Sequence, residues 1–442
     1  MSLFRHAGAE AACDTVSLEV DQVWTEILAD APAAAAIAAA ILTLFVAAEL
    51  IRRTTGVPTE YTRKLTHVGA GAVVMSFPWV ISSPWTVALL SLAFFGILVA
   101  GKATGMLTSV HSIDRKTSGA YYYPFAVLGT FWLADGNPLL FCVPIAVMAL
   151  ADTVAALVGR KAGMVRYRVF DNSRTLEGSL CFFGIALGLL VIGLALAGVP
   201  GWPAMLIVAL VAAIMSTATE AISVRGVDNL FIPYACFLVL DRTLRLGLRD
   251  LSGWVEGMLI GVLTVALTYR RASLTPAGSI TLFVVLTLCW ALGGWAWTMP
   301  LGALFFLYLA TVPEESQHVR ADLEEVFPTT VGSMIIVLAF GHFDDPVLFV
   351  PFLATVAASG AIALSRMAIV RGWPQVPLAL SGALVPVLPV LAYEPTTPVI
   401  PVIMAAGAGC VAFAALAQTS VSGRRLLSSL LAGAVAWAAV PF

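Results

Sequence analysis

The segments ADTVAALVGRK (residues 151–161) and RTLEGS (residues 174–179) lie on either side of a break between two long apolar runs. Each segment carries one carboxylate, Asp152 or Glu177, at the end of a run that is long enough to cross a bilayer. An ionisable side chain in membrane hydrocarbon costs about 3 kcal/mol on insertion scales. Both carboxylates therefore need an ionic partner, a metal ion or a polar cavity, which is the first indication of chemistry.

The composition extends this apolar pattern to the whole chain. Of its 442 residues, 60% are hydrophobic and 11% are charged, and the mean hydropathy is +0.94. Too few polar residues remain to cover a soluble particle of this size, and most apolar runs have the ~17–25 residues of a spanning helix. The sequence predicts an all-α polytopic membrane protein with about 16 transmembrane helices. They are expected at 31–51, 65–82, 85–101, 120–134, 138–159, 177–198, 203–222, 230–241, 252–269, 277–296, 298–313, 328–342, 346–365, 375–392, 396–418 and 425–440.

The distribution of basic residues predicts the orientation in the membrane. If all segments cross, the loops on one face hold 20 of the 24 Lys and Arg residues, and the positive-inside rule makes that face cytoplasmic. The weakest segment, 230–241, runs into Asp241 and Arg242 and is alternatively re-entrant or broken, which reduces the split to 16 against 8. With a full crossing, both termini lie outside, and the acidic tail 1–30, which lacks the pattern of a cleavable signal peptide, is extracytoplasmic. We expect an integral protein of the cell (inner) membrane.

The charge and cysteine patterns argue against a nucleic acid partner, a zinc site and a disulfide framework. The net charge is −2 and the basic residues are spread over short loops, so we expect no nucleic acid partner. The six cysteines are scattered without a CxxC spacing, so neither a zinc site nor a disulfide framework is indicated. The sequence leaves homo-oligomerisation open.

Internal similarity suggests two parallel, degenerate repeats. THVG at 66–69 is echoed by TTVG at 329–332, and RTLEGSL at 174–180 by RRLLSSL at 424–430. In the second copy Leu427 replaces Glu177, and Val411 or Ala412 stands near the place of Asp152. Since apolar, alanine-rich sequences imitate one another easily, chance similarity is an equal alternative. A true repeat would confine the active site to the first half.

Four polar clusters converge on the cytoplasmic boundary in this topology. They are Arg63, Lys64 and His67; residues 114–119 ahead of the tyrosines at 121–123; residues 152–179; and residues 220–233, with Glu220, Arg225, Asp228 and Asn229. Each has a structural alternative, namely basic anchors, an interfacial aromatic belt, snorkelling loop residues around one buried ion pair, or plain N-caps. His67 is equally compatible with neutral helix packing.

The third cluster suits a bound polyphosphate. Asp152 shares a helical face with small residues, where a ligand or another helix can approach closely. The amides of the helix that starts after Arg174 favour anions, and a carboxylate beside a polyphosphate usually holds Mg²⁺. Four basic residues follow Asp152 in the loop: Arg160, Lys161, Arg166 and Arg168.

At these residues the chain resembles the membrane-embedded, CTP-dependent lipid-alcohol kinases, the family of dolichol kinase, phytol kinase and CTP-dependent diacylglycerol kinase. The resemblance covers roughly residues 45–245 and keeps four motifs in order: RKLTH (63–67), ADTVAALVG (151–159), RTLEGS (174–179), and Glu220 followed by DNLFIP (228–233). Ala151 replaces the usual Gly, and Arg174 replaces the usual Lys, which leaves the nucleotide preference open. Residues 270–442 match nothing in the family.

The clusters and the resemblance together predict transfer of the terminal phosphate of CTP to the hydroxyl of an isoprenoid or lipid alcohol, such as phytol, a prenol or dolichol, at the cytoplasmic face. The expected cofactor is Mg²⁺, and the expected partners are the alcohol, the nucleotide and membrane lipids. The candidate catalytic residues are Asp152, Glu177, Asp228 and His67. The candidate phosphate-binding residues are Arg63, Lys64, Gly159, Arg160, Lys161, Arg174, Thr175, Gly178 and Ser179. The candidate metal ligands are Asp152, Glu220 and Asp228, and Asn229 is a further site residue.

Two alternatives stay open at this point. A cytidylyltransferase would also use CTP but would make a CDP-lipid and release pyrophosphate. A lipid transporter or scramblase would need no nucleotide, although the charged motifs gather on one face and leave little polarity at the midplane. The expected organisation is an extracytoplasmic tail over 1–30, a membrane-embedded kinase-like domain over 31–269, and a C-terminal membrane domain over 270–442.

Overall fold

The computed structural model describes residues 3–393 apart from 105–118, 170–171, 224–225, 246–247, 269–273, 312–322 and 373, together with a few isolated positions beyond 401. Except for one short hairpin, the elements of this part are helices, which confirms the all-α membrane class. Eight helical stretches in it are long and apolar enough to cross a membrane. The number of 16 spans and the internal repeat stay predictions. The segment expected at 396–418 and most of that at 425–440, with Val411 and Ala412, lie outside the described residues.

The chain divides into two compact units. The first comprises Met1–Met164 and Leu176–Leu240, and the second comprises Val165–Thr175 and Asp241–Phe442. The domain boundary expected at 269–270 thus falls within the second unit, after its first helix.

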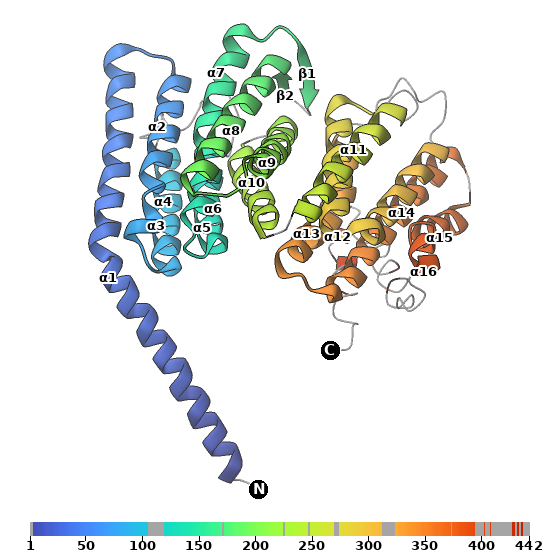
Figure 1. Cartoon of the computed structure of the whole chain (residues 1–442), viewed down its shortest axis with the longest axis horizontal. Helices are drawn as coiled ribbons and strands as arrows, with labels where there is room; N and C mark the ends of the chain where they lie inside the picture. The colour runs from blue at the N-terminus through green and yellow to red at the C-terminus, as the bar shows by residue number, and fades with distance from the viewer. Residues whose placement is uncertain are drawn as a thin grey trace. The chain divides into compact units, whose positions relative to one another are not determined.

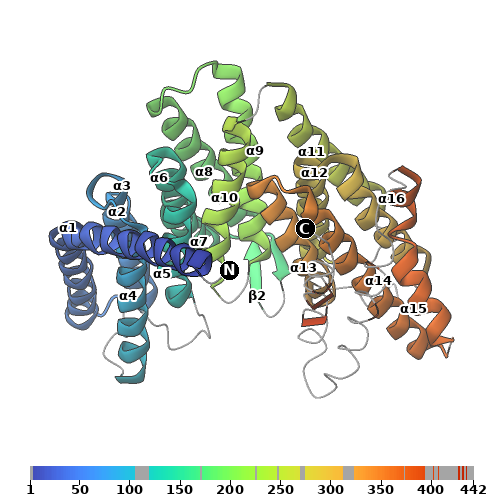
Figure 2. The same cartoon turned by 90° about the horizontal axis from the view of Figure 1, so that it is seen from below.

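The first unit consists of helices (Figure 1). They are α1 (Leu3–Thr55), α2 (Thr59–Val74), α3 (Phe77–Val80), α4 (Pro84–Thr104), α5 (Gly119–Ala134), α6 (Pro138–Ala146), α7 (Asp152–Ala162), α8 (Leu176–Leu196), α9 (Trp202–Ile222) and most of α10 (Asp228–Arg245). A π-helical turn, Val147–Ala151, joins α6 to α7 without a break. Neighbouring helices pack in pairs, α1 with α2, α4 with α5, α7 with α8 and α8 with α9 (Figures 1 and 2).

Helix α1 differs from the expected arrangement at its start. The tail expected at 1–30 is helical from Leu3, so one long helix replaces a separate tail and span. Asp30, within α1, is 4% exposed, and its carboxylate accepts the backbone N–H groups of Ser82 at 3.0 Å and Ser83 at 2.9 Å. These residues immediately precede α4, whose first amides lack intrahelical acceptors. Asp30 therefore anchors the start of α4 to α1.

The connection between α1 and α2 follows from its sequence. Gly56 has φ +65°, a left-handed conformation that glycine adopts without strain at a helix C-terminus, and its N–H donates to the Arg52 carbonyl at 3.2 Å. Pro58 then precedes Thr59, the first residue of α2. The span expected at 65–82 is accordingly two helices: α2 begins earlier than expected, and α3 follows a turn at Met75 and Ser76.

The second unit contains the hairpin and the remaining helices. The bounds are β1 (Arg166–Val169), β2 (Asn172–Thr175), α11 (Leu248–Thr268), α12 (Pro276–Thr311), α13 (Leu323–Phe343), α14 (Phe349–Arg371), α15 (Gln375–Leu384) and α16 (Leu388–Tyr393). The strands are antiparallel, with Arg166 opposite Thr175, where the sequence predicts only a loop. Helix α12 contains a kink at Gly294 (φ +65°), which matches the expected break between 277–296 and 298–313.

Two features of the second unit bear on sequence predictions. Helix α10 continues without a break through Asp241 and Arg242 to Arg245, so the segment at 230–241 is not broken there; its crossing of the membrane stays a prediction. Helices α14 and α15 touch through Gly360 and Gly382, where an added Cβ on either would collide with the backbone of the other. Small residues therefore bring these two helices into backbone contact.

Candidate active site

The first and third clusters meet in a buried ion pair between α2 and α7. The ammonium Nζ of Lys64 lies 2.6 Å from Asp152 Oδ2 and 3.4 Å from the Asp152 carbonyl oxygen. The two side chains are only 5% and 9% exposed. Because a buried charge is stable only when it is paired and hydrogen-bonded, each residue supplies the partner that the other requires. The pair joins two motifs that are 88 residues apart in the sequence.

His67 lies next to this pair, one turn along α2. Its Nε2 is 3.2 Å from the carbonyl oxygen of Met148, in the π turn, and 3.9 Å from Asp152 Oδ2. The imidazole side chain is 9% exposed, and the Tyr123 ring contacts it edge-to-face at a centroid distance of 5.2 Å. His67 is thus held between a main-chain carbonyl and an aromatic ring.

The π turn directly precedes Asp152. A π turn holds one residue more than an α-helical turn, so it determines which face of the following helix carries each side chain, and such turns are frequent at functional sites. Pro144, three residues before the turn, has no N–H to contribute to the helical hydrogen-bond ladder. The four residues Val147, Met148, Ala149 and Ala151 are buried, so the turn is part of the core of the first unit.

A second group of charges surrounds Glu60, in the first turn of α2. Glu60 Oε1 lies 2.7 Å from Arg63 Nη2 and 2.8 Å from Arg160 Nη2, and its Oε2 accepts from Arg63 Nε at 3.1 Å. Burial alone would raise the pKa of this carboxyl, but the hydrogen bond from Arg63 and the charges of Arg63, Arg160 and Lys64 hold the pKa below its ordinary value. One carboxylate therefore fixes two of the expected phosphate-binding arginines.

Asp228 belongs to the same electrostatic group. Burial works against the charged form of Arg63, but the hydrogen bonds that it donates to Glu60 and the charges of Glu60, Asp152 and Asp228 raise the pKa of its guanidinium. Asp228 is the first residue of α10, and the Nδ2 of Asn229 donates to the Gly119 carbonyl at 2.9 Å, which fixes α10 to the start of α5. The fourth cluster is thereby joined to the first and third.

The remaining predicted residues lie at helix ends or in the hairpin. Gly159, Arg160 and Lys161 form the last turn of α7, with Arg160 and Lys161 exposed, and Glu177, Gly178 and Ser179 form the first turn of α8, which packs against α7. Glu220 is buried near the end of α9. Arg174 and Thr175 belong to β2, which groups with the second unit. Residues 114–118 and Arg225 lie outside the described residues.

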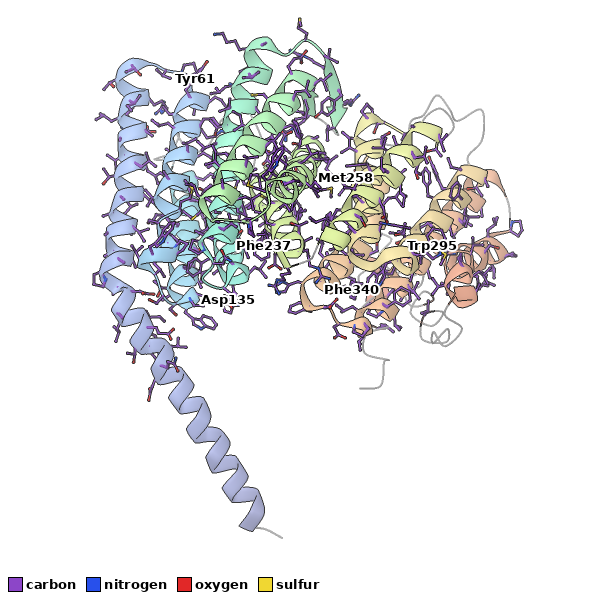
Figure 3. All side chains as sticks on the ribbon, in the orientation of Figure 1. Tyr61, Asp135, Phe237, Met258, Trp295 and Phe340 are labelled. Carbon is purple, nitrogen blue, oxygen red and sulfur yellow. The ribbon has the colours of Figure 1, made fainter. Side chains whose placement is uncertain are left out.

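The sequence did not predict three features of the candidate site, which are the ion pairs of Glu60, the π turn, and the contact of Tyr123 with His67. Glu60 stands three residues before Arg63, a spacing at which side chains of a helix meet, so its pairing was detectable. The π turn carries no comparable signal, because its residues are as apolar as the rest of the run. Figure 3 labels Tyr61, next to Glu60, at one end of the first unit and Asp135 at the other end.

A bound magnesium ion requires suitably placed oxygen ligands from the protein. No group of three His, Cys, Asp or Glu residues that could hold a metal occurs among the described residues, so the expected triad of Asp152, Glu220 and Asp228 is not assembled as a metal site there. Mg²⁺ that arrives with a nucleotide needs only one or two carboxylates, since phosphate oxygens and water complete its coordination. Asp152 and Asp228 both act electrostatically on Arg63, and their binding of Mg²⁺ stays a prediction.

Comparison with known proteins identifies the family. The chain is 34% identical over 196 residues to a phytol kinase from Synechocystis sp.; the match covers 83% of that protein and 43% of this chain. No family model and no solved structure matches the chain. Identity at this level over most of the relative's length is a family relationship. The chain therefore belongs to the phytol kinase family of lipid-alcohol kinases.

Proposed function

We propose that this protein is a kinase that transfers the terminal phosphate of CTP to the hydroxyl of a prenyl alcohol of the phytol type. The observation that carries the proposal is the 34% identity over 83% of a phytol kinase. The buried pair of Lys64 and Asp152 supports it, because it brings two of the expected motifs to one place at the end of membrane helices. Neither a transporter nor a scramblase needs this group of cations and carboxylates at a single helix end.

The charged groups of the site have two proposed roles, the binding of phosphate by cations and the binding of Mg²⁺ by carboxylates. Arg63 and Arg160, fixed by Glu60, supply planar donors that suit phosphate oxygens, and the first-turn amides of α8 provide further donors. Asp152 and Asp228 supply the carboxylates that would hold a nucleotide-bound Mg²⁺, which neutralises the charge on the transferring phosphoryl group. Glu177, in the first turn of α8, is the further carboxylate available to orient the alcohol.

Catalysis then consists of positioning and charge neutralisation. The alcohol oxygen forms a bond to the terminal phosphorus while the bond from that phosphorus to the bridging oxygen breaks. The products are a lipid monophosphate and CDP, and the alcohol proton leaves through a carboxylate of the site to water. The polyprenyl tail lies among the apolar helices, so the reacting hydroxyl is at the membrane boundary, which we place at the cytoplasmic leaflet.

The test uses purified full-length protein in liposomes with Mg²⁺, CTP labelled on the γ-phosphate, and phytol, geranylgeraniol, dolichol and diacylglycerol in parallel. We expect label in the phytol or geranylgeraniol product and release of CDP. Asp152→Asn should abolish transfer, whereas Asp135→Asn is the matched control, because Asp135 is exposed at the opposite end of the first unit and asparagine tolerates its φ of +45°.

Three results would overturn the proposal. Release of pyrophosphate with cytidine in the lipid would show a cytidylyltransferase. Absence of transfer from any nucleotide to any alcohol by folded protein would exclude a kinase. Equal activity of Asp152→Asn and the wild type would remove Asp152 from the active site.

A further inference from the structure

One face of α2 is fitted to the π turn by three residues. Lys64, His67 and Gly71 follow the i, i+3, i+7 spacing that places residues on one helical face. Lys64 binds Asp152, His67 binds the Met148 carbonyl, and a Cβ on Gly71 would lie 2.7 Å from the Cβ of Ala149. Helix α2 thus contacts the turn at Met148 and Ala149 and the first residue after it at Asp152, and glycine at position 71 allows the close approach.

We propose that His67 is a positioning residue, which fixes the π turn and thereby aims Asp152, and that it is not the base that receives the alcohol proton. A carbonyl oxygen can only accept a hydrogen bond, so the ring nitrogen that contacts Met148 carries the proton and donates it. The nitrogen that is 3.9 Å from Asp152 is this same Nε2. Nε2 therefore has no lone pair to offer to a substrate. In the neutral ring the remaining lone pair is on Nδ1, and the experiment below tests whether that nitrogen takes up the alcohol proton.

The contact of His67 with the Met148 carbonyl affects the direction of the Asp152 side chain. The extra residue in the turn sets the rotation of α7, and with it the direction of the Asp152 side chain. Lys64 holds the carboxylate of Asp152, while His67 holds the main chain four residues earlier. Loss of the second contact would leave Asp152 paired but free to shift, and a misplacement of 1 Å at a reacting group can cost about a hundredfold in rate.

Glutamine and leucine distinguish positioning from proton transfer. The amide nitrogen of Gln reaches nearly as far as the Nε2 of His and donates a hydrogen bond, but an amide does not titrate. Leu keeps the apolar bulk and cannot donate. The matched control is His342→Gln, a His-to-Gln change in α13 of the second unit. The kinetic arm of the test rests on the proposed function.

The experiment measures kcat, the KM for CTP and the pH profile of kcat in liposomes, together with amide hydrogen exchange over residues 148–152. His67→Gln should keep kcat within about threefold of the wild type with the same pH profile, because removal of a true general base costs about 10²-fold or more. His67→Leu should lower kcat about tenfold or more with the KM for CTP nearly unchanged, and should speed the exchange.

Several outcomes would overturn the proposal. They are a His67→Gln variant as inactive as His67→Leu, a lost acidic limb of the pH profile in His67→Gln, or unchanged exchange in folded His67→Leu. If His67→Leu does not fold, Gly71→Ala disturbs the same contact from the other side and should speed the same exchange. Should the wild type transfer no phosphate, the proposed function fails, and the exchange data alone decide whether His67 fixes the turn.

Discussion

Removal of one member of the Lys64–Asp152 pair should destabilise the protein far more than removal of both. At 2.6 Å and an effective dielectric constant of ~20, the attraction between the two charges is about 6 kcal/mol. Desolvation of each ion costs several kcal/mol, so the pair is worth little relative to two apolar side chains of similar size. A single charge left at 5% or 9% exposure has no such compensation.

The perturbation is a double-mutant cycle of Lys64→Met, Asp152→Leu and the double variant. We expect each single variant to lower the free energy of unfolding by about 3–5 kcal/mol, and the double variant to recover most of that loss. The assay is reversible unfolding of the full chain in mixed micelles, followed by circular dichroism and by tryptophan fluorescence. Phosphate transfer should be absent from all three variants, so stability and activity separate in the double variant.

The control for side-chain removal is Lys102→Met, at the end of α4, which loses the contact of its ammonium with the Tyr121 ring at 5.5 Å and should change the free energy of unfolding by no more than about 1 kcal/mol. Additive losses in the double variant would refute the reasoning, because additivity means that the two charges do not interact. Single variants as stable as the wild type would show that the charges reach water.

Three further predictions follow from other contacts of the first unit. The pKa of Glu60 is lower in the folded protein than its ordinary 4.5, so its stabilising contribution is present above about pH 4.5 and is lost as the pH falls. The difference in unfolding free energy between the wild type and Glu60→Gln, measured from pH 7 to pH 4, should therefore shrink on acidification. A constant difference would contradict this reasoning. Asp30→Ala leaves the amides of the exposed Ser82 and the buried Ser83 without their acceptor and should cost about 2 kcal/mol in unfolding free energy, whereas the exposed Asp21→Ala should be neutral. Tyr123→Phe removes a buried hydroxyl that has no hydrogen-bond partner among the described residues and keeps the ring against His67, so stability should rise by about 1 kcal/mol; a loss of stability would show that the hydroxyl is paired.

The sequence predicted the helices well because their signal is local. Runs of apolar residues bounded by Gly, Pro and charge marked most helix ends within a few residues, including the break in α12 at Gly294. The features that escaped prediction depend on partners that are distant in the sequence or on subtle backbone geometry. In the sequence Asp30 looks like one more acidic residue of a tail, since nothing near it shows that the N–H groups that donate to it lie 52 and 53 residues away.

The structure brings together several residues that the sequence proposed for the site, while their roles stay predictions. The carboxylate of Asp152 was expected to need a partner, and Lys64 is that partner. Lys64 was assigned instead to the phosphates, because a lysine beside an arginine at a helix start looks the same in sequence whether it faces a ligand or a buried carboxylate. His67 was assigned to catalysis for a similar reason: its ring chemistry is visible in the sequence, but the carbonyl that holds it is not.

The ion pairs of the site affect which form of the nucleotide it can bind. In the described contacts Lys64 is paired with Asp152, and Glu60 is shared by Arg63 and Arg160, so each of these cations already contacts a carboxylate. A polyphosphate without a metal ion would have to displace the carboxylates from the cations, and those carboxylates would then have no positively charged partner. A magnesium nucleotide carries both signs of charge, so its phosphate oxygens can take over the cations while its metal compensates the released carboxylate. We therefore predict that the metal complex binds more tightly than the free nucleotide, because only the complex replaces each ion pair that it opens.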